Sequence, residues 1–307
     1  MIKKALATLL FFLLTACSGA ASQPPITAYV DLSIRQPLPQ PTGEVTPLRV
    51  AVASVVSPQG TVESYSLLLD YLSTHLSRPV ELVQRRTYAE INDLVEHGEV
   101  DLAFVCTSAY IAGHDKFKME LLAAPQVNGE TIYHSNLIVP AESRAQRMAD
   151  LKGKVFAFTD PMSLSGRMYP TYLVQQLGTT PEKFFGRIFY TYSHDDAIYA
   201  VANKLADGAA VDSLVYQYAL ERDPALKNKV RIIEQSPAFG IPPVVVNPNL
   251  RPQLKAELLD LLLGMNQSSD GQKALQAIGV ERFVPINDNA YEGVRSLLGE
   301  ITAPGLP

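Results

Sequence analysis

The sequence predicts an α/β protein of two lobes, on the basis of three observations. From residue 47 onward, apolar runs with strand character alternate with amphipathic helical stretches, an order typical of parallel strands joined by crossover helices. This alternation occurs twice, once before and once after Leu151-Lys152-Gly153. Two extended runs, Thr131–Pro140 and Ile241–Val246, lie between and after the two series. We therefore expect two α/β lobes joined by a hinge of two crossing strands.

The predicted elements follow the chain in order. In the first series, strands and helices are expected alternately over Leu48–Ala53, Val62–Leu76, Val80–Gln84, Tyr88–His97 and Val100–Val105. In the second series, strands are expected over Lys154–Thr159, Arg187–Tyr192 and Val230–Glu234, with helices from Ser165 onward and over Asp195–Leu205. Three helices, Pro252–Met265, Gly271–Ile278 and Ala290–Ile301, end the chain and are expected to pack on the first lobe. We therefore assign residues 47–137 and 243–307 to lobe 1, and residues 138–242 to lobe 2.

The N-terminus has the layout of a secretory signal peptide, predicted over residues 1–16. Lys3 and Lys4 precede an apolar run, Ala5–Leu14, that is too short to span a bilayer as a mature helix. The sequence Leu14-Thr15-Ala16-Cys17 resembles a bacterial lipobox, which implies lipid attachment to Cys17; a plain signal peptide with an incidental cysteine is the alternative. Residues 17–46 are rich in proline and small polar residues, which is typical of a tether. We expect an extracytoplasmic protein, lipid-anchored to a membrane of the cell envelope.

Composition and motifs argue against several classes of function. The net charge of −5 disfavours a nucleic-acid partner, and Cys106 alone accompanies Cys17, so no disulfide framework is expected. The five histidines lack metal-ligand spacing, and phosphate-loop and dinucleotide motifs are missing, so we expect neither metal nor cofactor. The sequence contains no Gly-x-Ser-x-Gly elbow, and the adjacent residues Ser193-His194-Asp195 cannot form a catalytic triad because successive side chains point in different directions. We expect a monomer that is not an enzyme.

The segment Asp160–Arg167 joins a predicted strand to a predicted helix. Backbone N–H groups at the start of a helix have no partner within it and attract an oxyanion. Ser163 and Ser165 can each donate a hydrogen bond, and Gly166 allows close approach of the backbone. The alternative is that a serine here simply caps the helix. For Arg167, a partner that is an anion or an acidic neighbour and a solvated helix face are both open.

Further polar side chains follow the other predicted strands. Ligands of open α/β sheets lie outside the carboxyl ends of the strands. The candidates at these positions are Tyr65, Thr107, Ser108, Tyr110, His194, Asp195 and Asp212. Because hydroxyls dominate this set, the cleft suits a small, strongly hydrogen-bonding anion better than an apolar ligand.

Nearly the whole mature chain resembles the phosphate, phosphite and phosphonate-binding proteins of ABC importers, which have the periplasmic-binding-protein type II fold. The resemblance is carried by Glu99–Phe104, Asp150–Lys154, Asp160–Gly166, Ser193–Asp195 and Ala200–Asn203. It implies that Ser163, Leu164, Ser165 and Gly166 bind the phosphonate oxygens, with His194 and first-lobe tyrosines completing the pocket. The chain departs from the family at two places: Leu164 stands where threonine is usual, and Cys106-Thr107 where Gly-Pro is common.

The resemblance implies a solute-binding lipoprotein that captures a small phosphorus oxyanion, which can be a phosphonate, phosphite or phosphate, and delivers it to an ABC permease. A sensor that passes its closed form to a membrane signalling receptor is the alternative. A ligand with a P–OH group needs a proton acceptor, which sulfate would not use at neutral pH. Asp195 and Asp212 are candidates for that acceptor, although each can instead cap the helix that follows it.

Overall fold

The computed structural model of the protein describes residues 46–301. The predicted signal peptide, Cys17 and all of the predicted tether except Thr46 lie outside the described residues. Within the described part of the chain, no helix is both long and apolar enough to cross a membrane.

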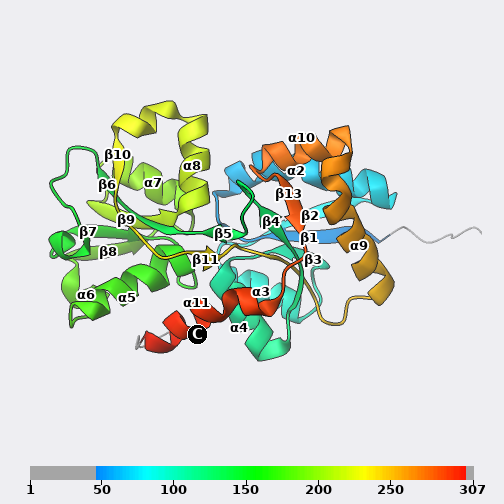
Figure 1. Ribbon diagram of the computed structural model, residues 1–307, viewed down its shortest axis with the longest axis horizontal. Helices are drawn as coiled ribbons and strands as arrows, with labels where there is room; N and C mark the ends of the chain where they lie inside the picture. The colour runs from blue at the N-terminus through cyan, green and yellow to red at the C-terminus, as the bar shows by residue number, and fades with distance from the viewer. Residues whose placement is uncertain (1–45, 302–307) are drawn as a thin grey trace, which may run out of the picture. The chain divides into compact units, whose positions relative to one another are not determined.

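The first lobe is built on a six-stranded sheet with the strand order β13-β4-β12-β3-β1-β2 (Figure 1). Its strands are β1 (Leu48–Val52), β2 (Val80–Gln84), β3 (Leu102–Phe104), β4 (Glu120–Gln126), β12 (Val244–Val246) and β13 (Arg282–Val284). Its helices are α2 (Pro58–Leu76), α3 (Tyr88–Glu96), α4 (Thr107–Phe117), α9 (Pro252–Gly264), α10 (Ser269–Ala277) and α11 (Glu292–Glu300), with single 3₁₀ turns at Met265–Gln267 and Asp288–Tyr291. Side chains of α2, α9 and α10, among them Leu68, Leu258 and Leu275, share a core with the sheet.

The second lobe is built on a five-stranded sheet with the strand order β10-β6-β9-β7-β8. Its strands are β6 (Ser135–Pro140), β7 (Val155–Phe158), β8 (Arg187–Tyr190), β9 (Gly208–Asp212) and β10 (Val230–Gln235). Its helices are α5 (Tyr169–Gln176), α6 (Pro181–Phe184), α7 (His194–Ala202) and α8 (Ser213–Arg222), with 3₁₀ turns at Met148–Leu151 and Pro224–Asn228 and a π-helical turn at Leu164–Met168. The helix expected from Ser165 thus begins as this π turn and continues as α5.

Two segments connect the lobes, and a short two-stranded sheet joins them. The strands β5 (Ile132–Tyr133) and β11 (Phe239–Gly240) pair antiparallel, with Tyr133 opposite Phe239. In Figure 1 this pair lies between the two larger sheets. The expected hinge of two crossing strands is therefore present. The predicted lobe boundary after residue 137 falls inside β6, which belongs to the five-stranded sheet.

The expectation of parallel strands is right for β1 to β3, β7 and β8, and wrong for β10, the last strand expected in the second series, which pairs antiparallel with β6. Strand β1 pairs parallel with β2 and β3, and β7 pairs parallel with β8 and β9. By contrast β4, β6, β10, β12 and β13 make only antiparallel pairs. Strands β4, β6, β10 and β12 flank the two crossings, so the chain enters or leaves each sheet through them without a crossover helix. Helical crossovers force a parallel direction, whereas these connections do not.

Helix caps fix the segments that lead into the cleft. Ser57 caps α2, with its side chain accepting from Gly60 N and with Pro58 at the first helical position, where a missing N–H costs nothing. The helix therefore begins one turn before the predicted Val62. Thr87 and Glu90 form a capping box on α3, which fixes Tyr88 as the first residue of that helix.

Candidate functional site

The site lies between the lobes, at the carboxyl ends of strands from both sheets. The Val55 carbonyl, after β1, accepts a 2.9 Å hydrogen bond from the backbone N–H of His194, the first residue of α7. Asp160 Oδ2, after β7, accepts from the backbone N–H of Tyr88 at 3.1 Å. Asp195 Oδ1 accepts from Ser57 N at 2.8 Å. Two carboxylates of the second lobe thus meet the N-terminal ends of α3 and α2, where the helix dipole favours negative charge.

Ser163 caps the π turn and also keeps a proton free. Its Oγ accepts from Gly166 N at 3.0 Å and lies 3.4 Å from His194 Nε2. The other ring nitrogen of His194, Nδ1, accepts from Asp212 N at 3.0 Å, so the ring proton is assigned to Nε2. Both acceptor positions of the Ser163 hydroxyl are then occupied, and its own proton remains available for a ligand. The two interpretations of Ser163, cap and anion donor, are compatible.

His194 is a neutral part of this network. Its side chain is almost fully buried, and burial lowers its pKa to about 3. A neutral imidazole with Nδ1 as acceptor donates through Nε2, so the ring can support Ser163 without adding a positive charge to the site.

Four buried hydroxyls near this network have no hydrogen-bond partner among the described residues. They belong to Tyr88, Tyr133, Thr159 and Ser165. The Tyr133 phenol lies near enough to the Thr107 and Ser165 hydroxyls for both to affect its pKa. Burial raises the pKa of both tyrosines well above the usual value, so the phenols stay protonated and can donate. Because unpaired buried polar groups are rare, such a group calls for an explanation such as an absent ion or ligand.

Gly166 is required by a close approach. A Cβ at this position would overlap the Thr159 side chain, so a larger residue would displace the threonine or the turn. Leu164 points the other way: its side chain is buried in the apolar core, and its backbone N–H hydrogen-bonds the Cys106 thiol. Leu164 lacks the hydroxyl of the usual threonine, so its backbone N–H is its one remaining donor, and this N–H is directed to Cys106.

Two buried carboxyl groups flank the site. Asp212 Oδ1 accepts from Leu214 N at 2.7 Å and Val215 N at 3.3 Å, so it caps α8. Burial raises the pKa of Asp212 to about 7, and these two hydrogen bonds oppose the rise. Asp160 accepts from Met162 N at 2.7 Å as well as from Tyr88 N, and burial raises its pKa to about 6.

Residues at the start of α4 form hydrogen bonds to the second lobe and to the crossing strand β11. Thr107 Oγ1 donates to the Gly240 carbonyl of β11 at 2.7 Å, and Ser108 Oγ donates to the Met162 carbonyl of the second lobe. Cys106 is buried beside them, and burial raises the pKa of its thiol. The Thr107 and Ser108 protons are thus used by the protein.

Three further predicted residues lie outside the hydroxyl cluster, although Tyr65 lines a neighbouring cavity and Asp195 bonds across the lobes. The Tyr110 hydroxyl donates to Asp288 Oδ1 at 2.7 Å. Tyr65 packs edge-on against Phe104, with 5.1 Å between the ring centroids. Asp195 does not cap its own helix: Ser193 caps α7, and the Asp195 carboxylate accepts from Ser57 N.

Arg167 has an acidic neighbour and does not lie on a solvated helix face: its guanidinium lies 4.0 Å from Glu182 Oε1. Its side chain is mostly buried, with the guanidinium 4.7 Å from the centroid of the Phe158 ring. Its Nε donates to the Tyr190 hydroxyl at 2.9 Å. The charge is therefore held within the second lobe, by Glu182 and by aromatic neighbours.

Sequence reasoning missed Tyr88, Tyr133, Thr159 and Asp160 as site residues. Tyr88 follows β2 by four residues, so the rule used for the ends of β1 and β3 would have found it. Tyr133 lies on a crossing strand, where no strand-end rule applies.

Across residues 46–301 no group of three His, Cys, Asp or Glu side chains could hold a metal ion.

Comparison with known proteins places the chain in a family. Residues 50–291 match the family model described as ABC transporter, phosphonate, periplasmic substrate-binding protein. The chain is 27% identical over 280 residues to the phosphate-import protein PhnD of Mycolicibacterium smegmatis, which covers 83% of this chain and 86% of the relative. It is 22% identical to the probable ABC transporter phosphite binding protein PhnD1 of Prochlorococcus marinus, over 54% of this chain and 58% of that protein.

Solved structures support the same fold. The binding protein component of an ABC phosphonate transporter from Pseudomonas aeruginosa has a TM-score of 0.77 and 24% identity, covering 81% of this chain and 84% of that one. PhnD1 of Prochlorococcus marinus, solved with methylphosphonate, has a TM-score of 0.73 and 19% identity, covering 83% and 98%. The fold is therefore the predicted periplasmic-binding-protein type II fold. The chain belongs to the periplasmic phosphonate-binding protein family of ABC transporters, which are extracytoplasmic solute-binding proteins rather than enzymes.

Proposed function

We propose that this protein binds a small phosphorus oxyanion between its lobes and delivers it to an ABC permease. One observation carries the choice of an oxyanion: the unpaired hydroxyls of Tyr88, Tyr133, Thr159 and Ser165, together with the free proton of Ser163, are all donors. A tetrahedral anion offers several acceptor oxygens at once, which matches donors arriving from several directions. The names of the relatives, which include phosphate, phosphite and phosphonate proteins, agree with this class.

The buried carboxyl of Asp212 supports a ligand that carries a proton. A fully ionised dianion beside Asp212 would be repelled, whereas a P–OH group can donate to a carboxylate oxygen. Sulfate has no such proton at neutral pH. We therefore expect the site to favour phosphorus oxyanions over sulfate.

Closure of the lobes is the proposed output. In this structure Ser64 Oγ and Tyr218 OH lie 2.7 Å apart, and Arg222 pairs with Glu63 at 2.5 Å, both across the lobes. These contacts supplement the interlobe hydrogen bonds of Asp160 and Asp195. Opening would break them, with bending at β5 and β11, and would leave the second-lobe network intact. Because one chain supplies both walls of the site, we propose that a monomer suffices.

The domain division is proposed with the same reasoning. The expected division is 47–137 with 243–307 as one lobe and 138–242 as the other. We propose that the lobes move with each boundary shifted to the nearest crossing strand, β5 or β11, because Ser135–Leu137 of β6 pair with β9 of the second lobe. Small-angle scattering with and without bound ligand measures this motion. An unchanged radius of gyration on saturation would count against closure.

We propose further that Cys17 carries a lipid anchor, as its position after Leu14-Thr15-Ala16 indicates. Two or more acyl chains would hold the protein stably at a membrane surface. Mass spectrometry of the protein extracted from membranes should find an acylated N-terminal Cys17. Recovery of wild-type protein in the soluble extracytoplasmic fraction, as for Cys17→Ala, would contradict the anchor.

Thermal unfolding of the chain from Ser18 to Pro307 tests the function. Phosphate, phosphite, methylphosphonate and aminoethylphosphonate are compared with sulfate. A ligand at about a hundred times its dissociation constant adds roughly 2.7 kcal/mol, which raises the midpoint by about 5 °C or more in a protein of this size. A shift with at least one phosphorus oxyanion and none with sulfate is expected. No shift with any of the four would refute the proposal.

A further inference from the structure

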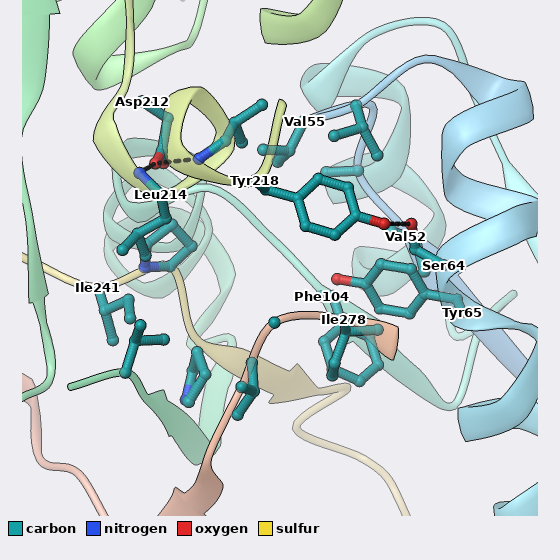
Figure 2. A pocket seen from close by; sticks show the side chains of 18 of the residues that line it. Val52, Val55, Ser64, Tyr65, Phe104, Asp212, Leu214, Tyr218, Ile241 and Ile278 are labelled. Atoms are coloured by element: carbon teal, nitrogen blue, oxygen red, sulfur yellow. Dashed lines mark hydrogen bonds between the residues drawn. The ribbon is translucent and has the colours of Figure 1, made fainter. Parts of the chain in front are cut away.

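A cavity of about 190 Å³ lies between the lobes beside Asp212. Figure 2 shows its wall, which is made mostly of aliphatic and aromatic side chains. Val55 and Phe104 come from the first lobe, Leu214 and Val215 from α8, Ile241 from the second crossing, and Ile278 from the end of α10. The sequence predicts a cleft better suited to a small hydrogen-bonding anion than to an apolar ligand, because that prediction rests on the hydroxyl-rich strand ends and not on these residues.

Two residues of the cavity wall, Asp212 and Val55, also hold His194 of the hydroxyl-lined site. Asp212 lines the cavity, and its backbone N–H also holds His194, the partner of Ser163. Val55 lines the cavity too, and its carbonyl accepts from the backbone N–H of His194. A molecule whose head occupies the hydroxyl cluster would therefore extend its remaining atoms past Asp212 and into this space.

Most polar groups on the cavity wall are already paired. Ser64 Oγ and Tyr218 OH bond each other at 2.7 Å, and Asp212 Oδ1 accepts from two backbone N–H groups, as drawn in Figure 2. The one other carboxylate of the wall, Glu221, lies on the exposed side of α8 and accepts from Gln217 Nε2 at 3.3 Å. A charged group entering the cavity would lose its hydration without gaining a full set of partners.

The size of the cavity sets the size of its occupant. A cavity of about 150 Å³ lined by aliphatic and aromatic groups binds benzene, so this one can hold a phenyl ring or a short alkyl chain. Phosphate, phosphite or methylphosphonate would leave it unfilled, and an unfilled apolar space contributes no contact energy.

We infer that the preferred ligand is an organophosphonate whose uncharged, apolar substituent fills this cavity while its phosphonate head binds the hydroxyl cluster. This rests on the proposed function. It narrows the ligand from small phosphorus oxyanions in general to those with an apolar carbon substituent of about three to seven carbons.

Isothermal titration calorimetry with the Ser18–Pro307 chain tests the inference with two comparisons. In the first, methyl-, propyl- and benzylphosphonate are titrated. Each buried methylene is expected to tighten binding by roughly fourfold, so propylphosphonate should bind at least tenfold more tightly than methylphosphonate. In the second, propylphosphonate is compared with 2-aminoethylphosphonate, which has nearly the same size but ends in an ammonium group. The propyl compound should bind at least tenfold more tightly.

Two variants locate the substituent. Ile278→Phe narrows the cavity, so it should abolish the advantage of propyl- over methylphosphonate and leave methylphosphonate binding within about twofold. Leu214→Glu places a carboxylate in the cavity wall, so it should reverse the preference between propylphosphonate and 2-aminoethylphosphonate. Leu214 is only partly buried, so this substitution does not rely on a fully enclosed position.

The possible outcomes distinguish failure of the apolar subsite from failure of the proposed oxyanion binding. Equal binding of methyl- and propylphosphonate, or tighter binding of the aminoethyl compound by the unchanged protein, overturns the apolar subsite while leaving the oxyanion site in place. Loss of all binding, including that of phosphite and phosphate, removes the proposed function and the inference together.

Discussion

The two lobes contribute to the site in different ways. On the second lobe, Ser163, His194 and Asp212 hold one another through hydrogen bonds that lie wholly within that lobe. On the first lobe and the crossing strand, the hydroxyls of Tyr88 and Tyr133 have no partner in the described part of the chain. The second-lobe half of the site is thus preorganised without ligand, whereas the two tyrosine hydroxyls need a ligand as their hydrogen-bond acceptor. Thr159 and Ser165, whose hydroxyls are also unpaired, are the exceptions on the second lobe.

The largest expected effect concerns the pH dependence of the second-lobe network. Burial raises the pKa of Asp212 from 3.8 to about 7, so its contribution to stability is complete below pH 3.8 and is lost as the pH rises through about 7. At about 1.4 kcal/mol per pKa unit, the loss approaches 4 kcal/mol. Asp212→Asn keeps a capping oxygen but does not titrate. The free energy of unfolding of this variant minus that of the wild type, measured with urea, should therefore increase from pH 4 to pH 8.

The exposed Asp260, changed to Asn, is the matched control and should show no such trend. His194 acts in the opposite direction, because its pKa is lowered from 6.5 to about 3 and its contribution is lost as the pH falls below about 6.5. The Asp212 comparison is therefore made as a difference between variant and wild type, in which the His194 term cancels. A difference that stays constant with pH would contradict the buried carboxyl.

Ser163→Ala should damage both the ligand site and the network. It removes a donor to the anion and leaves Gly166 N and His194 Nε2 without their acceptor, so we expect a loss of about 3 kcal/mol in binding, roughly a hundredfold. The midpoint of thermal unfolding without ligand should fall as well. Calorimetric titration with a bound oxyanion measures the first effect, and Ser296→Ala, on the exposed face of α11, serves as control. Full retention of affinity would show that Ser163 only caps the π turn and does not bind the ligand.

Ser165→Ala should weaken binding by about 1 to 3 kcal/mol, because a hydrogen bond to a charged ligand is lost. Unlike Ser163, its hydroxyl has no protein partner, so the unliganded protein should unfold at an unchanged or slightly higher temperature. The pair of serines therefore separates preorganisation from ligand contact. If both variants lowered the unliganded midpoint equally, this separation would be wrong.

Tyr88→Phe is expected to have the smallest effect, about 1 kcal/mol in binding, since one neutral donor of several is lost. The unliganded protein should gain slightly in stability because a buried unpaired hydroxyl is removed. Tyr110→Phe is the matched control: its hydroxyl bonds Asp288, so it should lose stability and keep its affinity. If Tyr110→Phe lost affinity and Tyr88→Phe did not, Tyr110 rather than Tyr88 would be the residue that contacts the ligand.

The fold could be predicted because its signal is periodic. Alternating apolar runs and amphipathic stretches located β1 to β3 and β7, β8 and β10 to within a few residues. Strands β4 and β13 were not predicted. Glu120–Gln126 contains two alanines and a proline, and Arg282–Val284 is only three residues long. The antiparallel direction of the crossing strands depends on how the lobes are connected, which no local pattern records.

The site could be predicted only in part, because side-chain direction decides it. The strand-end rule found Ser163, Ser165, His194 and Asp212, whose backbone positions already place them in the cleft. It could not tell that the hydroxyl of Tyr110 turns to Asp288 while that of Tyr88 is left unpaired. Likewise, the apolar cavity is assembled from segments far apart in the sequence, each of which alone is an ordinary core segment.

The position of Tyr133 on β5 has a kinetic consequence. A residue close to a rotation axis travels little when the bodies on either side swing apart, so Tyr133 should remain near Ser165 even when the protein is open. An arriving oxyanion would then meet the second lobe and Tyr133 first, and Tyr88 only as the cleft shuts. We expect changes at Tyr133 to slow capture of the ligand, and changes at Tyr88 to shorten the time that the ligand stays bound.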